Sequence, residues 1–180
     1  MKTDLRICPQ CSGHSRSDYV RFFINKFINE IHLNNKIIDL GCGRGRNIYY
    51  LKKLGFKNLT AIDINKFEQM NTKKIKFIQA DLVKGIPVNE KFNIILCNYL
   101  FMFIKDREAL ITEITNISDD ECFCVVELNK KNLKNGVLYD FNQIVNLFSE
   151  HWDIVNIRLK ENKFIAKKKQ IERTDKFGTW

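Results

Sequence analysis

The 180-residue sequence has little proline and little glycine, with two and eight residues respectively. This scarcity excludes a collagen-like or linker-like segment, and no internal repeat divides the chain. No stretch approaches the roughly 20 consecutive apolar residues of a membrane-spanning helix, and the N-terminus MKTDLRICPQ lacks the apolar core of a signal peptide. We therefore expect a single domain over residues 1–180, cytoplasmic and without a membrane partner.

The formal net charge of +9 is the main bias of the composition. A basic surface attracts nucleic acid, so RNA or DNA stands as an alternative partner. The lysines are mostly scattered in ones and twos among many Asn and Ile residues, as expected of an AT-rich genome. Scattered lysines favour a solvated surface without a polyanion partner. The sequence does not indicate an oligomeric state.

Six cysteines are present, several of them inside apolar runs that are typical of buried strands. Such runs favour reduced thiols over a secreted disulfide scaffold. Cys8-Pro-Gln-Cys11 resembles half of a zinc knuckle, with His14 close behind. A structural zinc site needs four ligands, and we expect Cys122 and Cys124 to point to opposite faces of a strand. We therefore predict no metal site, with Cys8 and Cys11 as the alternative zinc ligands.

Hydrophobic periodicity predicts alternating helices and strands. A cysteine-bearing head at residues 1–17 precedes a leading helix at residues 18–33, which Ser17 or Asp18 caps and whose buried face includes Ile28. We expect strands at Lys36–Leu40, Leu59–Ile62, Ile75–Gln79, Phe92–Cys97, Cys122–Leu128 and Trp152–Leu159, and helices at Asn47–Leu54, Arg107–Ile117 and Tyr139–Phe148. This alternation implies an α/β fold with a doubly wound, mostly parallel sheet in three α/β/α layers. Such sheets bind ligands at the carboxyl ends of their strands.

A glycine turn, Asp39-Leu-Gly-Cys-Gly-Arg-Gly45, follows the first predicted strand. It does not match the dinucleotide fingerprint G-x-G-x-x-G, because Arg46 stands at the third glycine position. Asp63 ends the second strand and Asp81 follows the third. One aspartate at such a place is usually a cap or a turn residue. Three of them beside a glycine turn indicate one ligand site at this edge of the sheet.

The turn DLGCGRG resembles motif I of the class I S-adenosylmethionine-dependent methyltransferases, and the resemblance runs from about Lys36 to the C-terminus. It implies the Rossmann-like class I methyltransferase fold and S-adenosylmethionine as cofactor. The resemblance assigns Asp39 to the α-ammonium, Asp63 to the ribose hydroxyls and Asp81 to the adenine amino group. The other implied cofactor-binding residues are Gly41, Cys42, Gly43, Gly45, Ile64, Leu82 and Cys97.

The end of the fourth strand, Cys97-Asn98-Tyr99-Leu100, lacks the (Asn/Asp/Ser)-Pro-Pro-aromatic motif of amino-directed nucleic-acid methyltransferases. It also lacks the Pro-Cys pair of cytosine-C5 enzymes, and Cys97 reads more simply as a buried strand residue. The segment FNIILCNYLFMFIKDREALITEI is similar to the tellurite-resistance methyltransferase family. That similarity implies a small-molecule acceptor, such as a chalcogen oxyanion or a thiol, which needs no strong base. Asn98, Tyr99 and His14 are the candidate catalytic residues.

The C-terminal piece is also similar to that family, in which a long strand leads through Arg173-Thr174-Asp175 into a last strand. Here that strand would stop early, at Trp180. Two alternatives to a small-molecule methyltransferase remain. The first, favoured by the net charge, is a methyltransferase that acts on RNA, DNA or protein. The second, left open by the absence of an evident base, is a cofactor-binding partner module without catalysis.

Overall fold

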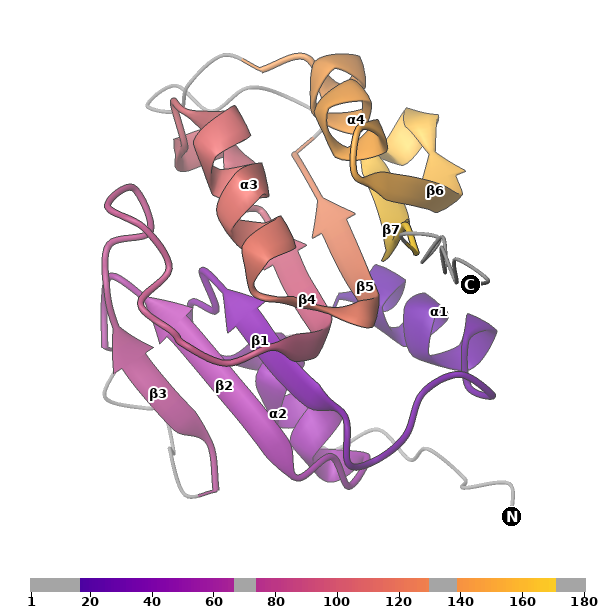
Figure 1. Ribbon diagram of the computed structural model, residues 1–180. Coiled ribbons are helices and arrows are strands. Elements are labelled where there is room, and N and C mark those ends of the chain that lie inside the picture. Colours follow the sequence, from indigo (N-terminus) through magenta and orange to yellow (C-terminus); the bar gives the residue numbers. More distant parts are fainter. Residues whose placement is uncertain (1–16, 67–73, 130–138, 171–180) are drawn as a thin grey trace, which may run out of the picture.

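Seven strands form one sheet in the order β3-β2-β1-β4-β5-β7-β6 (Figure 1). The computed structural model describes residues 17–66, 74–129 and 139–170. The strands are β1 Lys36–Leu40, β2 Asn58–Asp63, β3 Lys76–Gln79, β4 Phe92–Asn98, β5 Ser118–Glu127, β6 Trp152–Arg158 and β7 Lys163–Lys168. The helices are α1 Asp18–Lys26, α2 Arg46–Lys53, α3 Arg107–Asn116 and α4 Phe141–Ser149, with short 3₁₀ turns η2 Phe101–Phe103 and η3 Leu159–Glu161.

Strands β1 to β5 pair in parallel, and β7 runs antiparallel between β5 and β6. The predicted doubly wound, mostly parallel sheet is thereby confirmed. The chain moves outward from β1 to β2 and β3 and then returns to place β4 on the other side of β1. Sheets of this kind bind ligands in the crevice outside the carboxyl ends of the strands at such a reversal, which are here β1 and β4.

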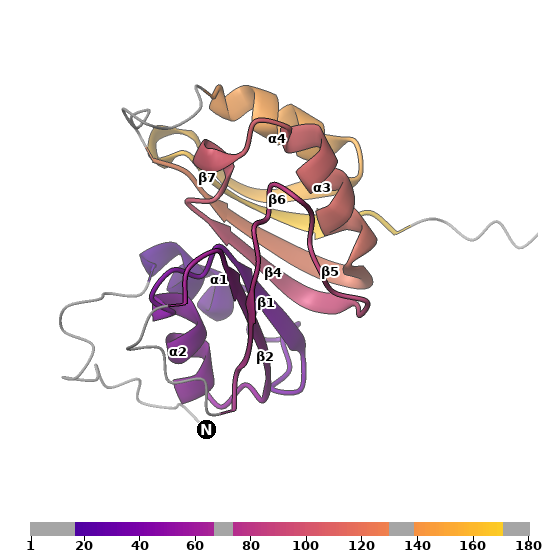
Figure 2. The same ribbon diagram turned by 90° about the vertical axis from the view of Figure 1, so that its left-hand side faces the viewer.

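Helices cover both faces of the sheet (Figure 2). On one face α1 and α2 pack on alternate strand residues such as Ile37, Ala61 and Leu96. On the other face α3 and α4 pack on the intervening residues, among them Ile38 and Ile95. This alternation follows from the two-residue period of a strand, and it makes both faces of the central strands apolar. The three-layer α/β/α arrangement is confirmed.

The leading helix is shorter than the sequence predicts. Helix α1 ends at Lys26, and Ile28, predicted to be buried, is 58% exposed. Past that point the sequence is Phe-Ile-Asn-Glu-Ile-His, mostly residues with weak helix propensity. Phe27 instead packs its ring against Phe123 of β5, with the two ring centroids 4.7 Å apart. The apolar period alone does not reveal this end, because it continues beyond the last helical turn.

The turn between the last two strands lies earlier than predicted. It is formed by η3 and Asn162, which adopts a left-handed φ of 52° that Asn tolerates better than most residues. Strand β7 then pairs with β5, so the sheet gains its antiparallel strand at Lys163–Lys168. The expectation of a turn at 173–175 is therefore wrong for this strand pair. Residues 173–175 and Trp180 lie outside the described residues.

Three of the buried thiols, those of Cys97, Cys122 and Cys124, lie on one face of the sheet, whereas Cys42 belongs to the core on the other face. Cys122 and Cys124 both lie in the core under α3 and α4, beside Cys97, and the Sγ atoms of Cys97 and Cys124 are 4.0 Å apart. The prediction of opposite faces is wrong, because residues two positions apart in a strand share a face. Cys8, Cys11 and His14 lie outside the described residues. Among the residues that are described, no helix is long and apolar enough to cross a membrane.

Candidate functional site

The glycine turn connects β1 to α2 at the crevice. The N–H groups of Gly41 and Cys42 donate to the carbonyl of Ile62 at 2.9 Å, so the turn is anchored to the end of β2. Gly43 has φ +54°, and a Cβ built on it would meet nothing within 4 Å. Its N–H donates to Oδ2 of Asp63 at 2.8 Å. The turn thus leaves open space on its outer side, where a ligand can approach the backbone closely.

Asp39 supplies a buried carboxylate beneath this turn. Its side chain is 2% exposed, and its Oδ2 atom has no hydrogen-bond partner. Burial raises the pKa of Asp39 to about 7, an effect that the Arg46 guanidinium opposes and the Asp63 carboxylate reinforces. A buried acceptor without a partner is rare in native proteins. It fits a ligand that carries an ammonium group, as S-adenosylmethionine does.

Asp63 closes the turn from the side of β2. Its two carboxylate oxygens accept from the N–H groups of Gly43 and Asn65. Asp81 follows β3 and accepts from the N–H of Val83 at 3.1 Å. Leu82 is buried in the core under α3, whereas Ile64 is exposed beside Asp63. Asp39, Asp63 and Asp81 therefore lie at the carboxyl edge of the sheet, together with the exposed aliphatic side chain of Ile64.

The two cysteines of the predicted cofactor set have different surroundings. Cys42 lies in the turn itself, and burial raises the pKa of its thiol, with smaller contributions from Asp39 and Asp63. A thiol with a raised pKa is a poor nucleophile. The Cys97 side chain is fully buried in the core under α3 and α4. Only the backbone of Cys97 is available to a ligand in the crevice.

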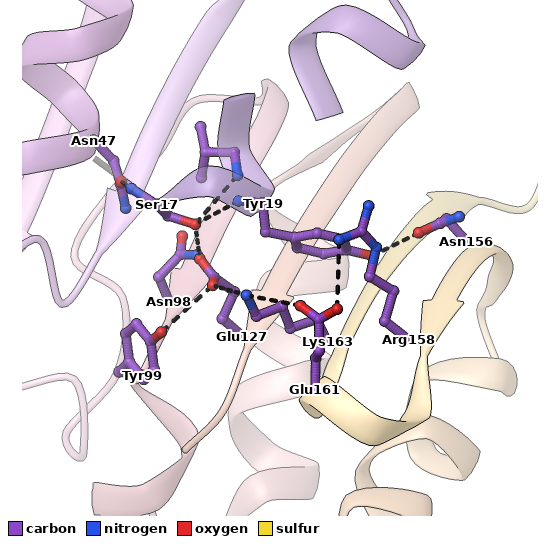
Figure 3. A network of polar contacts seen from close by, with 11 residues as sticks. Ser17, Tyr19, Asn47, Asn98, Tyr99, Glu127, Asn156, Arg158, Glu161 and Lys163 are labelled. Atoms are coloured by element: carbon purple, nitrogen blue, oxygen red, sulfur yellow. Dashed lines mark hydrogen bonds and ion pairs between the residues drawn. The ribbon is translucent and has the colours of Figure 1, made fainter. Parts of the chain in front are cut away.

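Asn98 and Tyr99 meet a buried acid that the sequence analysis did not select, Glu127 at the end of β5 (Figure 3). Oε1 of Glu127 accepts from the Asn98 side-chain amide and from the Ser17 hydroxyl. Oε2 accepts from the Tyr99 hydroxyl at 3.5 Å. Glu127 is 2% exposed, so these partners replace water around the carboxylate. The Asn98 Oδ1 atom is buried without a partner.

Lys163 of β7 completes this cluster and borders a cavity. Its ammonium lies 3.2 Å from Oε2 of Glu127 and 3.3 Å from Oε2 of Glu161. Tyr99, Glu161 and Lys163 line the cavity together with Leu128 and Asn129, and its volume is about 400 Å³. A space of this size suits a small organic molecule.

The sequence contained a signal for Glu127 that went unused. Cys-Phe-Cys-Val-Val-Glu-Leu is an apolar strand that ends in an acid, the pattern that singled out Asp39 and Asp63. Lys163 and Ser17 carry no such signal. Ser17 lies 110 positions from Glu127 along the chain, and only the fold brings them together.

Comparisons with known proteins agree with this architecture. The family model described as a methyltransferase domain matches residues 38–126. The malonyl-[acyl-carrier protein] O-methyltransferase of Calditerrivibrio nitroreducens is 26% identical over 129 residues, which is 66% of this chain and 52% of the relative. The chain thus spans about half the length of that curated relative.

Solved structures show the same fold at low identity. A TehB-like SAM-dependent methyltransferase from Corynebacterium glutamicum has a TM-score of 0.69 and 15% identity, covering 90% of this chain and 93% of its own. The 1,6-didemethyltoxoflavin-N1-methyltransferase of Burkholderia thailandensis has a TM-score of 0.67 and 13% identity, covering 86% and 78%. The latter structure contains 1,6-didemethyltoxoflavin and S-adenosylhomocysteine.

Proposed function

We propose, from the premise that this chain belongs to the class I S-adenosylmethionine-dependent methyltransferases, that it transfers a methyl group from S-adenosylmethionine to a small molecule. The observation that carries the proposal is the pairing of two features at one crevice. One is the glycine turn with the unpartnered Asp39 carboxylate. The other is the cavity bordered by Tyr99, which follows β4, and by Lys163, which begins β7.

The glycine turn and the acids hold the cofactor. Asp39 receives the α-ammonium, since a buried carboxylate without a partner gains most from a cationic donor. The backbone of Gly41, Cys42, Gly43 and Gly45 lies against the methionine and ribose parts. Asp63, already oriented by two backbone donors, takes the ribose hydroxyls.

The adenine ring lies beyond Asp63. Asp81 accepts from its amino group, and the exposed Ile64 side chain packs on the ring, while Leu82 supports the loop from the core. The Cys97 backbone borders the same crevice at the end of β4. An apolar side chain that is exposed in the ligand-free protein gains from covering an aromatic ring.

The acceptor lies on the other side of the transferred methyl, beside Asn98 and Tyr99. The cavity there, of about 400 Å³, matches the size of a small organic molecule. The Burkholderia relative, whose structure contains a small molecule together with S-adenosylhomocysteine, supports this choice. A small-molecule acceptor is therefore preferred to RNA, DNA or protein.

Calorimetric titration with S-adenosylmethionine, S-adenosylhomocysteine and NAD tests the cofactor half. We expect micromolar binding of the first two and none of NAD, with affinity lost in Asp63→Ala. Glu90→Gln is the matched control, because Glu90 is an acid paired with Lys36 and Lys76 away from the crevice. NAD binding, or equal loss of affinity in both variants, would contradict the proposal.

Methyl transfer to small molecules tests the acceptor half. Radiolabelled S-adenosylmethionine is incubated with pooled metabolites of low molecular mass and, separately, with mixed RNA. Label in the small-molecule pool is the expected result. Label in RNA alone would favour a nucleic-acid methyltransferase, and cofactor binding without any transfer would favour a non-catalytic module.

A further inference from the structure

Glu127 divides its two carboxylate oxygens between different neighbours (Figure 3). Oε1 holds the Asn98 amide and the Ser17 hydroxyl. Oε2 lies on the cavity side, between the Tyr99 hydroxyl at 3.5 Å and the Lys163 ammonium at 3.2 Å. One oxygen is therefore used to hold the surrounding elements together, and the other is directed to a residue that lines the cavity.

Tyr99 is the link between the Glu127 carboxylate and the cavity. It adopts a φ of 62°, in the left-handed region. This conformation is unfavourable for an aromatic residue, and residues held in such conformations concentrate at functional sites. Its N–H donates to the Glu127 carbonyl at 2.7 Å, and the Arg46 guanidinium lies 5.1 Å from its ring centroid. Because the hydroxyl hydrogen is directed to Glu127, the oxygen lone pairs are free to accept a hydrogen bond from a molecule in the cavity.

Lys163 keeps an ion-pair partner when Glu127 takes up a proton. Its ammonium is shared between Glu127 and Glu161 at nearly equal distances, 3.2 and 3.3 Å. If Glu127 becomes neutral, the ion pair with Glu161 remains.

We propose, resting on the proposed methyltransferase function, that Tyr99 and Glu127 relay a proton away from the acceptor, which is a small molecule whose nucleophilic oxygen or neutral nitrogen carries a hydrogen. The nucleophilic atom bonds to the methyl carbon, and the carbon–sulfur bond breaks with its electron pair left on sulfur. The hydrogen of the nucleophile passes to the Tyr99 oxygen while the Tyr99 proton passes to Oε2 of Glu127. Glu127 later returns this proton to solvent.

The relay implies that the acceptor is neither a chalcogen oxyanion nor a thiolate, because these have no proton to lose at the reacting atom. The charged and titratable groups around Glu127 come from several elements, and they are Tyr19 of α1, Tyr99 after β4, Arg158 of β6, Glu161 of η3 and Lys163 of β7. Of the carboxylates in this set, Glu127 is the buried one that contacts the Tyr99 hydroxyl.

Binding of matched probes gives a test that does not depend on turnover. The protein is loaded with S-adenosylhomocysteine, and ligand-observed NMR compares phenol with anisole and aniline with N,N-dimethylaniline, whose nitrogens are neutral at pH 7. We expect each hydrogen-bearing probe to bind at least 10-fold more tightly than its methylated partner, and the preference to disappear in Tyr99→Phe. Equal binding of the partners, or no binding of the hydrogen-bearing probes, would overturn the proposal.

Transfer of labelled methyl to the same phenol and amine, beside benzenethiol and tellurite, tests the relay itself. Glu127→Gln should lower kcat on the phenol and the amine by about 100-fold or more with little change in KM. Transfer to the thiol should change by less than 3-fold. Tyr99→Phe gives the same pattern without disturbing the other contacts of Glu127.

Glu30→Gln is the matched control, since Glu30 is an acid that pairs with another lysine of β7, Lys167, and lies outside the cavity lining. It should keep its kcat. Transfer confined to the thiol or tellurite, or an equal effect of Glu127→Gln and Glu30→Gln, would overturn the relay. Failure of the wild type to bind S-adenosylhomocysteine would instead contradict the proposed function.

Discussion

Asp39 shows how one buried residue can couple ligand binding to stability. Its carboxylate lies beneath the glycine turn with one oxygen unpartnered, and burial raises its pKa from 3.8 to about 7. Without a ligand, the charged form is therefore a destabilising feature of the folded protein at neutral pH. An ammonium group bound at this point would remove that penalty.

The pH dependence of stability should reflect Asp39. The folded state binds the proton up to about pH 7 and the unfolded chain only up to about pH 4. The free energy of unfolding therefore falls as pH rises through this window. Asp39→Asn removes the effect, so the variant should gain on the order of 4 kcal/mol relative to wild type between pH 4 and pH 8. Urea unfolding of the ligand-free proteins across this range measures it, and parallel pH curves for the two proteins would refute the assignment.

A substitution at Gly43 distinguishes the effect of backbone strain on stability from the effect of lost space on ligand affinity. Gly43→Ala places a methyl group where no atom lies within 4 Å, at φ +54°. We expect a stability loss of about 1–2 kcal/mol from the left-handed backbone and at least a 10-fold weaker binding of S-adenosylmethionine. Gly55→Ala, at φ +98° beside Leu33, is the control for backbone strain away from the crevice, since an alanine at this φ is strained at least as much. It should lose stability but retain affinity, and equal affinities in the two variants would argue against the cofactor position.

At the scale of elements, several contacts join the first half of α1 to the sheet. Ser17 caps the helix by accepting from the N–H groups of Tyr19 and Val20, and it also donates to Glu127. Farther along, the Tyr19 hydroxyl donates to Asn156 of β6, and Arg158 lies 4.2 Å from the Phe22 ring centroid. The start of α1 therefore joins the acceptor side of the site to the antiparallel edge of the sheet.

Ser17→Ala should cost more than the loss of an ordinary helix cap. It removes a cap, usually about 1 kcal/mol, and also one donor to a buried carboxylate, about 1–2 kcal/mol more. Asp106→Ala is the comparison, because Asp106 caps α3 through the single N–H of Ala109 and is otherwise exposed. Chemical denaturation of both variants gives the two costs. A cost for Ser17→Ala no larger than that for Asp106→Ala would mean that the Glu127 contact adds nothing.

Element boundaries separate what local sequence predicts from what it does not. The end of α2 is predicted well, since Gly55 follows Leu54 with φ +98°, and glycine at this position is a local signal. The end of α1 is predicted poorly, because no glycine or proline marks it and the contact of Phe27 with Phe123 is not local. A helix end that depends on a local turn residue can be predicted from the sequence, whereas one that depends on a tertiary contact cannot.

At the scale of the molecule, cofactor binding should stabilise the whole sheet. The proposed ligand contacts lie at the ends of β1, β2 and β4, which are central strands with both faces buried. S-adenosylhomocysteine at 100 times its Kd should stabilise the native state by about 2.7 kcal/mol and raise Tm by roughly 5–10 °C. Thermal unfolding with and without the ligand measures the shift, which NAD should not reproduce. The same shift in Asp63→Ala would place the ligand elsewhere.

The amino-acid sequence by itself determined the fold class and the edge at which the proposed cofactor site lies. Strand and helix periods, the glycine turn and the acids at strand ends are local patterns. Such patterns can be recognised in the sequence without a structure. The tertiary structure alone decided the insertion of β7 between β5 and β6, the raised pKa of Asp39 and the cluster around Glu127. Each of these depends on distances between residues far apart in the chain, such as Ser17 and Glu127, and no local pattern encodes such a distance.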